Sequence, residues 1–351
     1  MNLFKISKTD TPIPSRTGSR RGADDSLPTE DMNTQSSLSI ALATYNGERY
    51  IAEQLDSIAR QTRLPDELVI FDDLSVDATP TIVQNFARRA PFNVRFQVNS
   101  ERLGSTRNFE MAIRACGGDV IFLCDQDDVW YPNKIALIEE RFINDPGTGA
   151  VFTDADVVDQ ELHPFGQGLW KAVRFSSREQ ARVATRDAFS VLLKHFVVTG
   201  ATMAFRSTYR EVVLPIPEGW VHDAWIALLI AATSNLAALP APLIAYRQHS
   251  ANQIGIPRHG RNRGRTCAAI YEPQVLLYEA ARQRLLGYAN HLPDSKLKIH
   301  LLDEKLAFLR SCATMPDSRW GRLSVALQEL AKLHYHRYGG GLKKFRRDLL
   351  R

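Results

Sequence analysis

The residues with the clearest chemistry gather in the run GDVIFLCDQDDVW, residues 118–130. Val120–Cys124 is an apolar, β-favouring run, which predicts a buried strand. Asp125, Asp127 and Asp128 follow it within four positions, and such carboxylates repel one another unless a cation lies against them. In open α/β sheets, ligands bind outside the carboxyl ends of the strands, and Mg²⁺ typically takes one or two carboxylates plus substrate phosphates. The run therefore predicts a site for a divalent metal that carries a diphosphate.

Polar side chains also follow two earlier predicted strands. Tyr45 comes directly after Leu38–Thr44, and Asp72 and Asp73 come directly after Glu67–Phe71. Tyr45 could stack on a nucleobase, and either carboxylate could accept a hydrogen bond from a base N–H or a ribose hydroxyl. Each feature by itself fits a turn or a helix cap equally well. Their shared position at strand ends is what favours a nucleotide site.

Three further residues are candidates for chemistry. Arg107 lies in the first turn of a predicted helix, where backbone amides and a guanidinium favour an anion. Asp223 begins an apolar helix beside Trp220, which suits a helix-capping acid and a general base equally. His249 follows a proline-containing strand, and both a structural role and metal ligation fit it.

The elements that must position these residues alternate between strand and helix. Strands are predicted at Leu38–Thr44, Glu67–Phe71, Val94–Val98 and Val120–Cys124, and helices at Glu48–Arg60, Thr79–Arg89, Ser105–Cys116 and Lys134–Asn144. Such alternation implies an α/β fold, with a mostly parallel sheet and helices on both faces.

The pattern is less regular after Ala150. Strands are predicted at Val151–Val158, Gly200–Phe205 and Leu236–Tyr246, and helices at Ser177–Leu193, Asp223–Ala232, 272–291, 295–312 and 320–337. Residues 1–36 are rich in Ser, Thr, Pro, Arg and Asp, which predicts a disordered tail. A Gly/Arg-rich linker, 255–265, precedes the last helices.

Composition narrows the class of protein. The chain has 351 residues, of which 44% are hydrophobic and 24% charged, as in an ordinary globular protein. Its four cysteines form no CxxC pair, which argues against a zinc site and a disulfide framework and suits a reducing cytoplasm. No window reaches 18 uninterrupted apolar residues, so we expect no membrane span.

The net charge of +5 is unevenly distributed. Residues 256–351 hold 19 Lys+Arg and 8 Asp+Glu, a net charge of +11, and the rest of the chain carries −6. The basic part has no nucleic-acid motif, so an anionic membrane surface or an anionic lipid-linked substrate fits better than a nucleic acid. A solvated basic helical face is an equally good interpretation.

Several segments of the sequence, taken in order, match the motifs of a known enzyme family. The chain resembles a family 2 glycosyltransferase of the GT-A fold, and within that family the rhamnosyltransferase-type enzymes of bacterial surface-polysaccharide assembly. The matching pieces, in order, are SIALATYNGERYIAEQLDSIARQT, ELVIFDDLSVDAT, NSERLGSTRNF, GDVIFLCDQDDVWYPNKI, HDAW and YRQHSANQ. They cover about residues 38–254. The chain would then comprise a tail (1–36), a GT-A domain (37–254) and a helical basic C-terminal region (255–351).

The resemblance implies a role for each candidate residue. The nucleotide pocket would be lined by Thr44, Tyr45 and Glu48, with Asp72, and Asp73 beside it, on the base, Arg107 positioning the nucleotide and Asp125 toward the nucleotide sugar. Asp125 and Asp127 match the family's DxD motif, in which Asp127 would bind the metal. His249 would add a metal or diphosphate contact, and Asp223 would be the catalytic base.

The reaction implied is the inverting transfer of a single sugar from a dTDP- or UDP-sugar, with Mg²⁺ or Mn²⁺ as cofactor. The acceptor would be a hydroxyl of a glycan or lipid-linked glycan, in the cytoplasm and at the inner face of the membrane. The DQDDVW form suggests dTDP-L-rhamnose as the donor. The QxxRW motif of processive synthases is absent, because Pro316 stands where its Gln would precede Arg319-Trp320, and this favours single addition. DDLSVDAT departs from the usual DDGSTDGT at Leu74 and Ala78, which could alter the base preference.

Two other classes of protein remain open. A receiver domain of a signalling relay also has two acids after one strand and an Asp after a later strand, as Asp72, Asp73 and Asp125 are here. Such a domain would end soon after a lysine-bearing strand, whereas the pattern here continues through Asp223. A non-catalytic glycan-binding or scaffold protein could keep the same fold, although the intact Asp127 and His249 argue against it.

Overall fold

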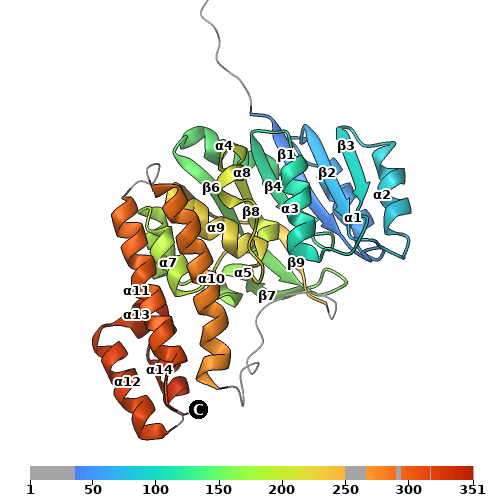
Figure 1. Ribbon diagram of the computed structural model, residues 1–351. Helices are drawn as coiled ribbons and strands as arrows, with labels where there is room; N and C mark the ends of the chain where they lie inside the picture. Colours follow the sequence, from blue (N-terminus) through green and yellow to red (C-terminus); the bar gives the residue numbers. More distant parts are fainter. Residues whose placement is uncertain (1–35, 250–265, 290–293, 317, 351) are drawn as a thin grey trace, which may run out of the picture. The chain divides into compact units, whose positions relative to one another are not determined.

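The computed structural model describes residues 36–249, 266–289, 294–316 and 318–350. Its centre is a nine-stranded sheet in the order β3-β2-β1-β4-β8-β6-β9-β5, with β7 paired to β6 (Figure 1). The strands are β1 (Leu38–Thr44), β2 (Glu67–Asp72), β3 (Asn93–Val98), β4 (Val120–Cys124), β5 (Val129–Trp130), β6 (Thr148–Val158), β7 (Pro164–Gly168), β8 (Met203–Arg206) and β9 (Asn235–Arg247). The α/β fold expected from the alternating pattern is therefore confirmed.

The first four strands form the parallel part of the sheet. β1 lies between β2 and β4, with Thr44 in register with Asp72 and Leu42 in register with Cys124. The chain leaves all three strands at the same edge, because their directions are the same. The rest of the sheet is mixed: β8 pairs antiparallel with both β4 and β6, while β9 runs parallel to β6.

Most predicted helices are present with shifts of a few residues. The helices before the C-terminal region are α1 (Ile51–Ala59), α2 (Thr79–Ala87), α3 (Ser105–Ala115), α4 (Lys134–Asn144), α5 (Leu169–Ala172), α6 (Ser177–Ala184), α7 (Ala188–Lys194), α8 (Arg210–Val213) and α9 (His222–Thr233). Short 3₁₀ turns occupy Gly200–Thr202 and Ser207–Tyr209. The prediction of one helix over Ser177–Leu193 is wrong, because Arg186 adopts a positive φ of 66° that separates α6 from α7.

The C-terminal region is helical, as predicted. It comprises α10 (Cys267–Gly287), α11 (Ser295–Ala313), α12 (Arg319–Ala331), α13 (His334–Tyr338) and α14 (Leu342–Leu349). The single helix predicted over 320–337 is divided at Leu333, whose φ is 62°. No helix in the described part of the chain is long and apolar enough to span a membrane. The predicted disordered tail and the Gly/Arg-rich linker lie outside the described residues.

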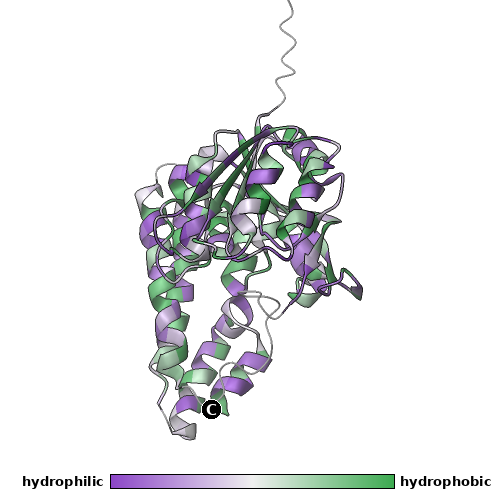
Figure 2. Cartoon of the chain, turned by 90° about the vertical axis from the view of Figure 1, so that its right-hand side faces the viewer, coloured by the Kyte–Doolittle hydropathy of each residue, from purple (hydrophilic) through white to green (hydrophobic). Residues whose placement is uncertain are grey.

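The core lies on the two faces of the sheet. Successive residues of β4 alternate between faces, so Phe122 packs with one hydrophobic cluster and Leu123 with the other. The C-terminal helices join the same cluster as α9, through buried side chains such as Tyr278 and Leu285. Figure 2 shows hydrophobic strands inside the sheet and a mixture of hydrophobic and hydrophilic residues along these helices. The basic C-terminal region is therefore packed into the core rather than simply appended to it.

Candidate active site

A cavity of about 610 Å³ opens at the carboxyl ends of β1 and β4. In the order β3-β2-β1-β4 the direction of strand succession reverses between β1 and β4, which is where α/β sheets bind ligands. Its volume lies in the usual range for small-molecule sites. Three segments distant in sequence meet there, represented by Tyr45, Asp125 and Asp223. The edge predicted from the sequence to bind a ligand is therefore the edge that is hollowed.

The three carboxylates of the acidic run after β4 have two different roles. Asp125 and Asp127 line the cavity. Asp128 is 1% exposed, and its Oδ1 accepts a hydrogen bond of 2.9 Å from the Arg247 backbone N–H. Asp128 therefore anchors the end of β9 to this loop, and two of the three carboxylates face the ligand space.

Gln126, between the two cavity carboxylates, joins this loop to the segment after β1. Its Oε1 accepts a hydrogen bond of 2.8 Å from the Tyr45 N–H, and its Nε2 donates one of 3.0 Å to the Tyr45 carbonyl. A Cβ added to Gly47 would lie 2.3 Å from Gln126 Oε1, so glycine leaves room for the amide. The amide thus fixes the position of the Tyr45 backbone relative to Asp125 and Asp127.

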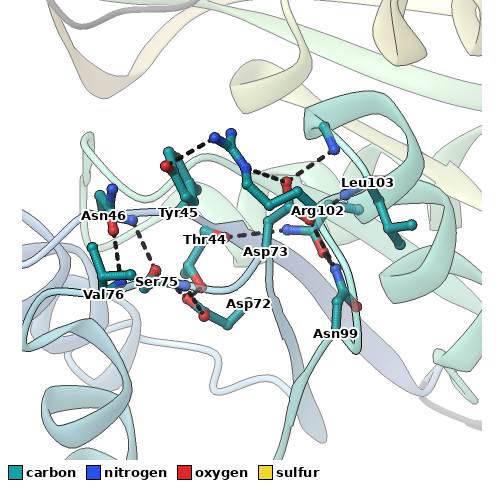
Figure 3. A network of polar contacts seen from close by, with 12 residues as sticks. Thr44, Tyr45, Asn46, Asp72, Asp73, Ser75, Val76, Asn99, Arg102 and Leu103 are labelled. Carbon is teal, nitrogen blue, oxygen red and sulfur yellow. Dashed lines mark hydrogen bonds and ion pairs between the residues drawn. The ribbon is translucent and has the colours of Figure 1, made fainter.

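The two carboxylates at the end of β2, Asp72 and Asp73, have different environments (Figure 3). Asp72 is fully buried, and its oxygens accept hydrogen bonds from the Thr44 hydroxyl and from the hydroxyl and N–H of Ser75. Asp73 lines the cavity and accepts hydrogen bonds from the backbone N–H groups of Leu103 and Gly104. Asp73, rather than Asp72, is therefore the carboxylate in contact with the ligand space, while Asp72 holds the turn.

Arg102 was not among the residues singled out from the sequence. Its guanidinium lies over the Tyr45 ring, 3.7 Å from the centroid, and its Nη1 donates a hydrogen bond of 2.9 Å to the Tyr45 hydroxyl (Figure 3). Its Nε is 3.8 Å from Asp73 Oδ2. Arg102 therefore sets the orientation of the aromatic ring and brings a positive charge to the rim of the cavity.

Besides Asp72, two more predicted nucleotide-site residues lie outside the cavity lining. Arg107 donates a hydrogen bond of 2.8 Å to Glu110, one turn further along α3. Glu48 is exposed, and its carboxylate accepts a hydrogen bond of 2.9 Å from the Ala78 N–H at the start of α2. Both side chains stabilise helices in this structure. The predicted nucleotide-site residues that line the cavity are Thr44, Tyr45, Asp73 and Asp125.

Asp223 lies in the first turn of α9 and faces the cavity. Its Oδ2 accepts a hydrogen bond of 2.9 Å from the Gly200 N–H, and its Oδ1 accepts one from the Ala224 N–H. Next to it, His222 is 6% exposed and stacks on Phe109 with a centroid distance of 3.9 Å. Burial lowers the pKa of His222, so the imidazole beside Asp223 is neutral at pH 7.

The C-terminal helix α10 holds the segment that leads into α9. The Trp220 indole donates a hydrogen bond of 2.9 Å to the Leu277 carbonyl. The Arg284 guanidinium donates hydrogen bonds to the carbonyls of Val212, Leu214 and Pro215. The position of Asp223 therefore depends on a helix that lies outside the part of the chain carrying the family motifs.

The end of β9 returns to the acidic loop. His249 Nε2 lies 2.8 Å from Asp127 Oδ2, and the imidazole packs on Tyr50 with a centroid distance of 4.8 Å. Arg247, which is 2% exposed, donates from its Nε to the Asp127 carbonyl at 2.8 Å. The structure thus brings together Asp127 and His249, the two residues predicted to bind a metal, from positions 122 residues apart.

The acidic residues perturb one another electrostatically. Burial, together with the charges of Asp127 and Asp223, raises the pKa of Asp125 to about 8. Burial, together with the charges of Asp127 and Asp125, raises the pKa of Asp128 well above its ordinary value. Lys134 is fully buried behind the loop, with its Nζ 3.8 Å from the centre of the Trp130 ring, and partly offsets this negative charge. A divalent cation at the loop would favour the ionised carboxylates.

The donor set fits a hard divalent cation. Asp125 and Asp127 supply carboxylate oxygens at the rim of the cavity, and the His249 imidazole is in contact with Asp127. Among the residues that the structure describes, no three Asp, Glu, His or Cys side chains converge as a complete metal site. Mg²⁺ bound with a nucleotide usually has one or two protein ligands, and phosphate oxygens and water complete its coordination shell.

Comparison with known proteins agrees with this geometry. The sequence model described as glycosyl transferase family 2 matches residues 39–212. A protein of Shigella flexneri named dTDP-rhamnosyl transferase RfbG is 38% identical over 233 residues, which cover 61% of this chain and 73% of that protein. A Nostoc protein named as an uncharacterized glycosyltransferase is 29% identical over 225 residues, 61% of this chain and 66% of its own.

A solved structure shares the fold. The crystal structure of Staphylococcus aureus TarS residues 1–349 with UDP-GlcNAc superposes with a TM-score of 0.52 at 20% sequence identity. The match covers 84% of this chain and 77% of that one, and at this identity it bears on the fold alone. The sequence comparisons carry the assignment further: the chain belongs to glycosyl transferase family 2, as its motifs indicated, and is a glycosyltransferase.

Proposed function

We propose that this protein transfers a single sugar, with inversion, from a nucleoside-diphosphate sugar to a hydroxyl of a glycan or lipid-linked glycan. The observation that carries the proposal is that Asp125, Asp127 and Asp223 face one cavity together with Tyr45 and Asp73. Asp125 and Asp127 suit a metal–diphosphate, and Asp223 suits a general base. Tyr45 and Asp73 suit a nucleoside. We assign this activity to residues 37–254, with the C-terminal helices supporting Asp223.

On the nucleotide side, Tyr45 offers a ring for the base to stack on. The Asp73 carboxylate is held by two backbone N–H groups at 2.7 and 2.9 Å, so it is a fixed acceptor for a base N–H or a ribose hydroxyl. Thr44 completes this part of the wall. A receiver-type domain has no need of such a nucleoside pocket, and the family assignment removes that alternative.

On the diphosphate side, Asp127 and His249 are the residues that would hold Mg²⁺ or Mn²⁺, with Asp125 turned toward the sugar. A bound divalent cation would neutralise the negative charge that develops on the departing diphosphate. Arg102 supplies a further positive charge at the rim, 2.9 Å from the Tyr45 hydroxyl. These residues orient the donor so that its C1 points toward Asp223.

Asp223 is the proposed base. It accepts the proton of the acceptor hydroxyl as the oxygen attacks C1, on the sugar face opposite the diphosphate. Its two backbone hydrogen bonds fix the direction of the carboxylate before the acceptor arrives. The C1–diphosphate bond breaks as the new glycosidic bond forms, so the configuration at C1 inverts without a covalent enzyme intermediate.

One comparison supports a particular donor. The Shigella flexneri relative is named a dTDP-rhamnosyl transferase and is 38% identical to this chain. Together with the DQDDVW run, this supports dTDP-L-rhamnose, with other dTDP- or UDP-sugars as the next candidates. We place the reaction in the cytoplasm at the inner face of the membrane, where a lipid-linked acceptor would be presented.

The test is a panel of dTDP- and UDP-sugars in thermal-shift measurements with and without Mn²⁺. A donor that binds the native state raises the apparent Tm, and we expect the largest metal-dependent rise with dTDP-L-rhamnose. A folded protein whose Tm responds to no nucleotide sugar, with or without metal, would refute the proposal. That result would instead favour a non-catalytic scaffold.

A matched pair of variants separates donor binding from the transfer step. Asp223→Asn should retain the donor-induced Tm shift and lose about 10²- to 10⁴-fold in kcat, the usual contribution of a general base. Glu218→Gln makes the same carboxylate-to-amide change at an exposed position outside the cavity lining and should keep the wild-type activity. Transfer by Asp223→Asn at the wild-type rate would show that the base is a different residue.

A further inference from the structure

The adjacent helices α12 and α14 each expose a row of side chains that the proposed reaction does not use. α12 packs against α14, and the two helices lie next to each other near the C-terminus (Figure 1). We call these two exposed rows together the α12/α14 face. It consists of Trp320, Ser324, Leu327 and Ala331 on α12, and Leu342, Lys343, Arg346, Arg347 and Leu350 on and just after α14.

The α12 part of this face is uncharged and largely apolar. Trp320, Ser324, Leu327 and Ala331 are spaced by four, three and four residues, so they form one stripe along the helix. Trp320 is 83% exposed and Leu327 is 49% exposed. A tryptophan left almost entirely in water on a stripe of this kind is typical of a surface that meets a partner.

The α14 part is basic with apolar ends. At 3.6 residues per turn, positions 342, 343, 346, 347 and 350 lie within one side of the helix, and all five side chains are exposed. Leu342 is 57% and Leu350 59% exposed. None of the three cations on this side forms an ion pair with a residue that the structure describes (Lys343, Arg346, Arg347).

The acidic side chains described in the same region are buried. Glu329 and Asp348 are the acidic residues among the described positions from Ser318 to Leu350, and both are buried. Asp348 accepts hydrogen bonds from Tyr271 and Tyr335 on the inner side of α14. The charge that these helices expose to solvent is therefore positive.

We propose that the α12/α14 face docks on the surface of a bilayer containing anionic phospholipids. Trp320 and the exposed leucines would enter the boundary between head groups and acyl chains, which is the preferred depth of amphipathic apolar side chains. Arg346 and Arg347 would bind the phosphate groups, and their long stems would lie along the apolar surface. Charge complementarity selects this partner, because a neutral surface would leave these cations without counter-charges.

The inference goes beyond the proposed function and does not depend on the identity of the donor. The described part of the chain has no helix that could span a membrane. The proposed docking would nevertheless hold the active site near a lipid-linked acceptor. Removing the whole C-terminal region would be a poor test, because Tyr278 and Leu285 of α10 belong to the hydrophobic core around α9. Point substitutions on the exposed face leave that core intact.

The experiment is co-sedimentation of the full-length protein with two kinds of vesicle. One contains phosphatidylcholine alone, and the other contains about one third phosphatidylglycerol. Wild type should bind the anionic vesicles and should dissociate at high salt, because exposed charges are screened. Arg346→Glu/Arg347→Glu should weaken binding by about 30-fold or more, since each surface cation strengthens binding about fivefold. Trp320→Ser should also weaken binding.

The control is Arg60→Glu/Arg88→Glu, which makes the same change of net charge at exposed positions of the α/β part. This variant should bind like wild type, and all variants should keep the wild-type Tm and its response to donor, which separates this test from that of the proposed function. Equal weakening by the control would overturn the proposal, as would failure of wild type to bind anionic vesicles. If Trp320→Ser instead converts a dimer to a monomer in sedimentation velocity while vesicle binding is absent, the face binds a second copy of this chain.

Discussion

Gln126 links the acidic loop to the segment after β1, and its removal should loosen the donor site. The amide makes two hydrogen bonds to the Tyr45 backbone, at 2.8 and 3.0 Å. A hydrogen bond of this kind contributes about 0.5–1.5 kcal/mol net, so Gln126→Ala should reduce the free energy of unfolding by about 1–3 kcal/mol. Gln126→Glu should cost at least as much, because a carboxylate oxygen would then oppose the Tyr45 carbonyl.

Gly47 allows the same contact to be measured independently. Alanine there would place its Cβ 2.3 Å from Gln126 Oε1 and 2.6 Å from Cδ, so the amide would have to leave Tyr45. Gly47→Ala should therefore be costly in the wild-type background and nearly neutral in Gln126→Ala. The two substitutions should be non-additive by about 1–2 kcal/mol, as expected for side chains in direct contact.

Urea unfolding of the four proteins gives these free energies, and donor titration followed by Tm gives the effect on binding. Gln84→Ala, an exposed glutamine of α2, is the matched control and should change neither quantity. We expect weaker donor binding in Gln126→Ala because Tyr45 is no longer held against the acidic loop. Equal cost of Gly47→Ala in both backgrounds would refute the account of the Gln126 contact.

Three further predictions follow from the geometry. Asp127→Ala should abolish the Mn²⁺-dependent part of donor binding in thermal-shift titrations, while Asp127→Glu should retain some of it. Arg102→Ala should weaken donor binding about three- to tenfold by isothermal titration, since it releases the Tyr45 ring from a cation–π contact and a hydrogen bond; unchanged affinity would show that the ring is held without it. Burial would raise the pKa of Glu179, but hydrogen bonds led by that from Lys194 outweigh it and lower the pKa to about 2. A lowered carboxyl pKa stabilises the fold above pH 4.5 and loses this effect as pH falls toward 2, so the stability gap between wild type and Glu179→Gln should close over that range in urea unfolding; a constant gap would contradict the assignment.

The strand–helix framework was predictable because the local pattern and the final environment agree. Val120–Cys124 is apolar at every position and lies in the middle of the sheet, buried on both faces, so its bounds match the prediction. The division between α6 and α7 was not predictable in this way. It depends on Arg186 at a positive φ, which neither its residue type nor the hydrophobic period indicates.

Some residues predicted to bind the nucleotide instead contact a residue close to them in the sequence. Arg107 has Glu110 three residues ahead on the same helix face, a spacing that favours an ion pair within the helix. Asp72 has Ser75 three residues ahead, a spacing that favours a turn closed by the side chain. Both signals were present in the sequence. Arg102 gives no such signal, because its partners Tyr45 and Asp73 follow β1 and β2 and are distant from it in the sequence.

The acidic run shows how the fold chooses among neighbouring carboxylates. Asp125, Gln126 and Asp127 all line the cavity, and Asp128 is buried beside it. Gln126 and Asp128 also bind the backbones of Tyr45 and Arg247. The intervening residues need polar groups to satisfy backbone atoms at the ends of β1 and β9. The DxD spacing and the identity of its neighbouring residues therefore meet one requirement, since the same short loop must bind a ligand and also hold the ends of β1 and β9.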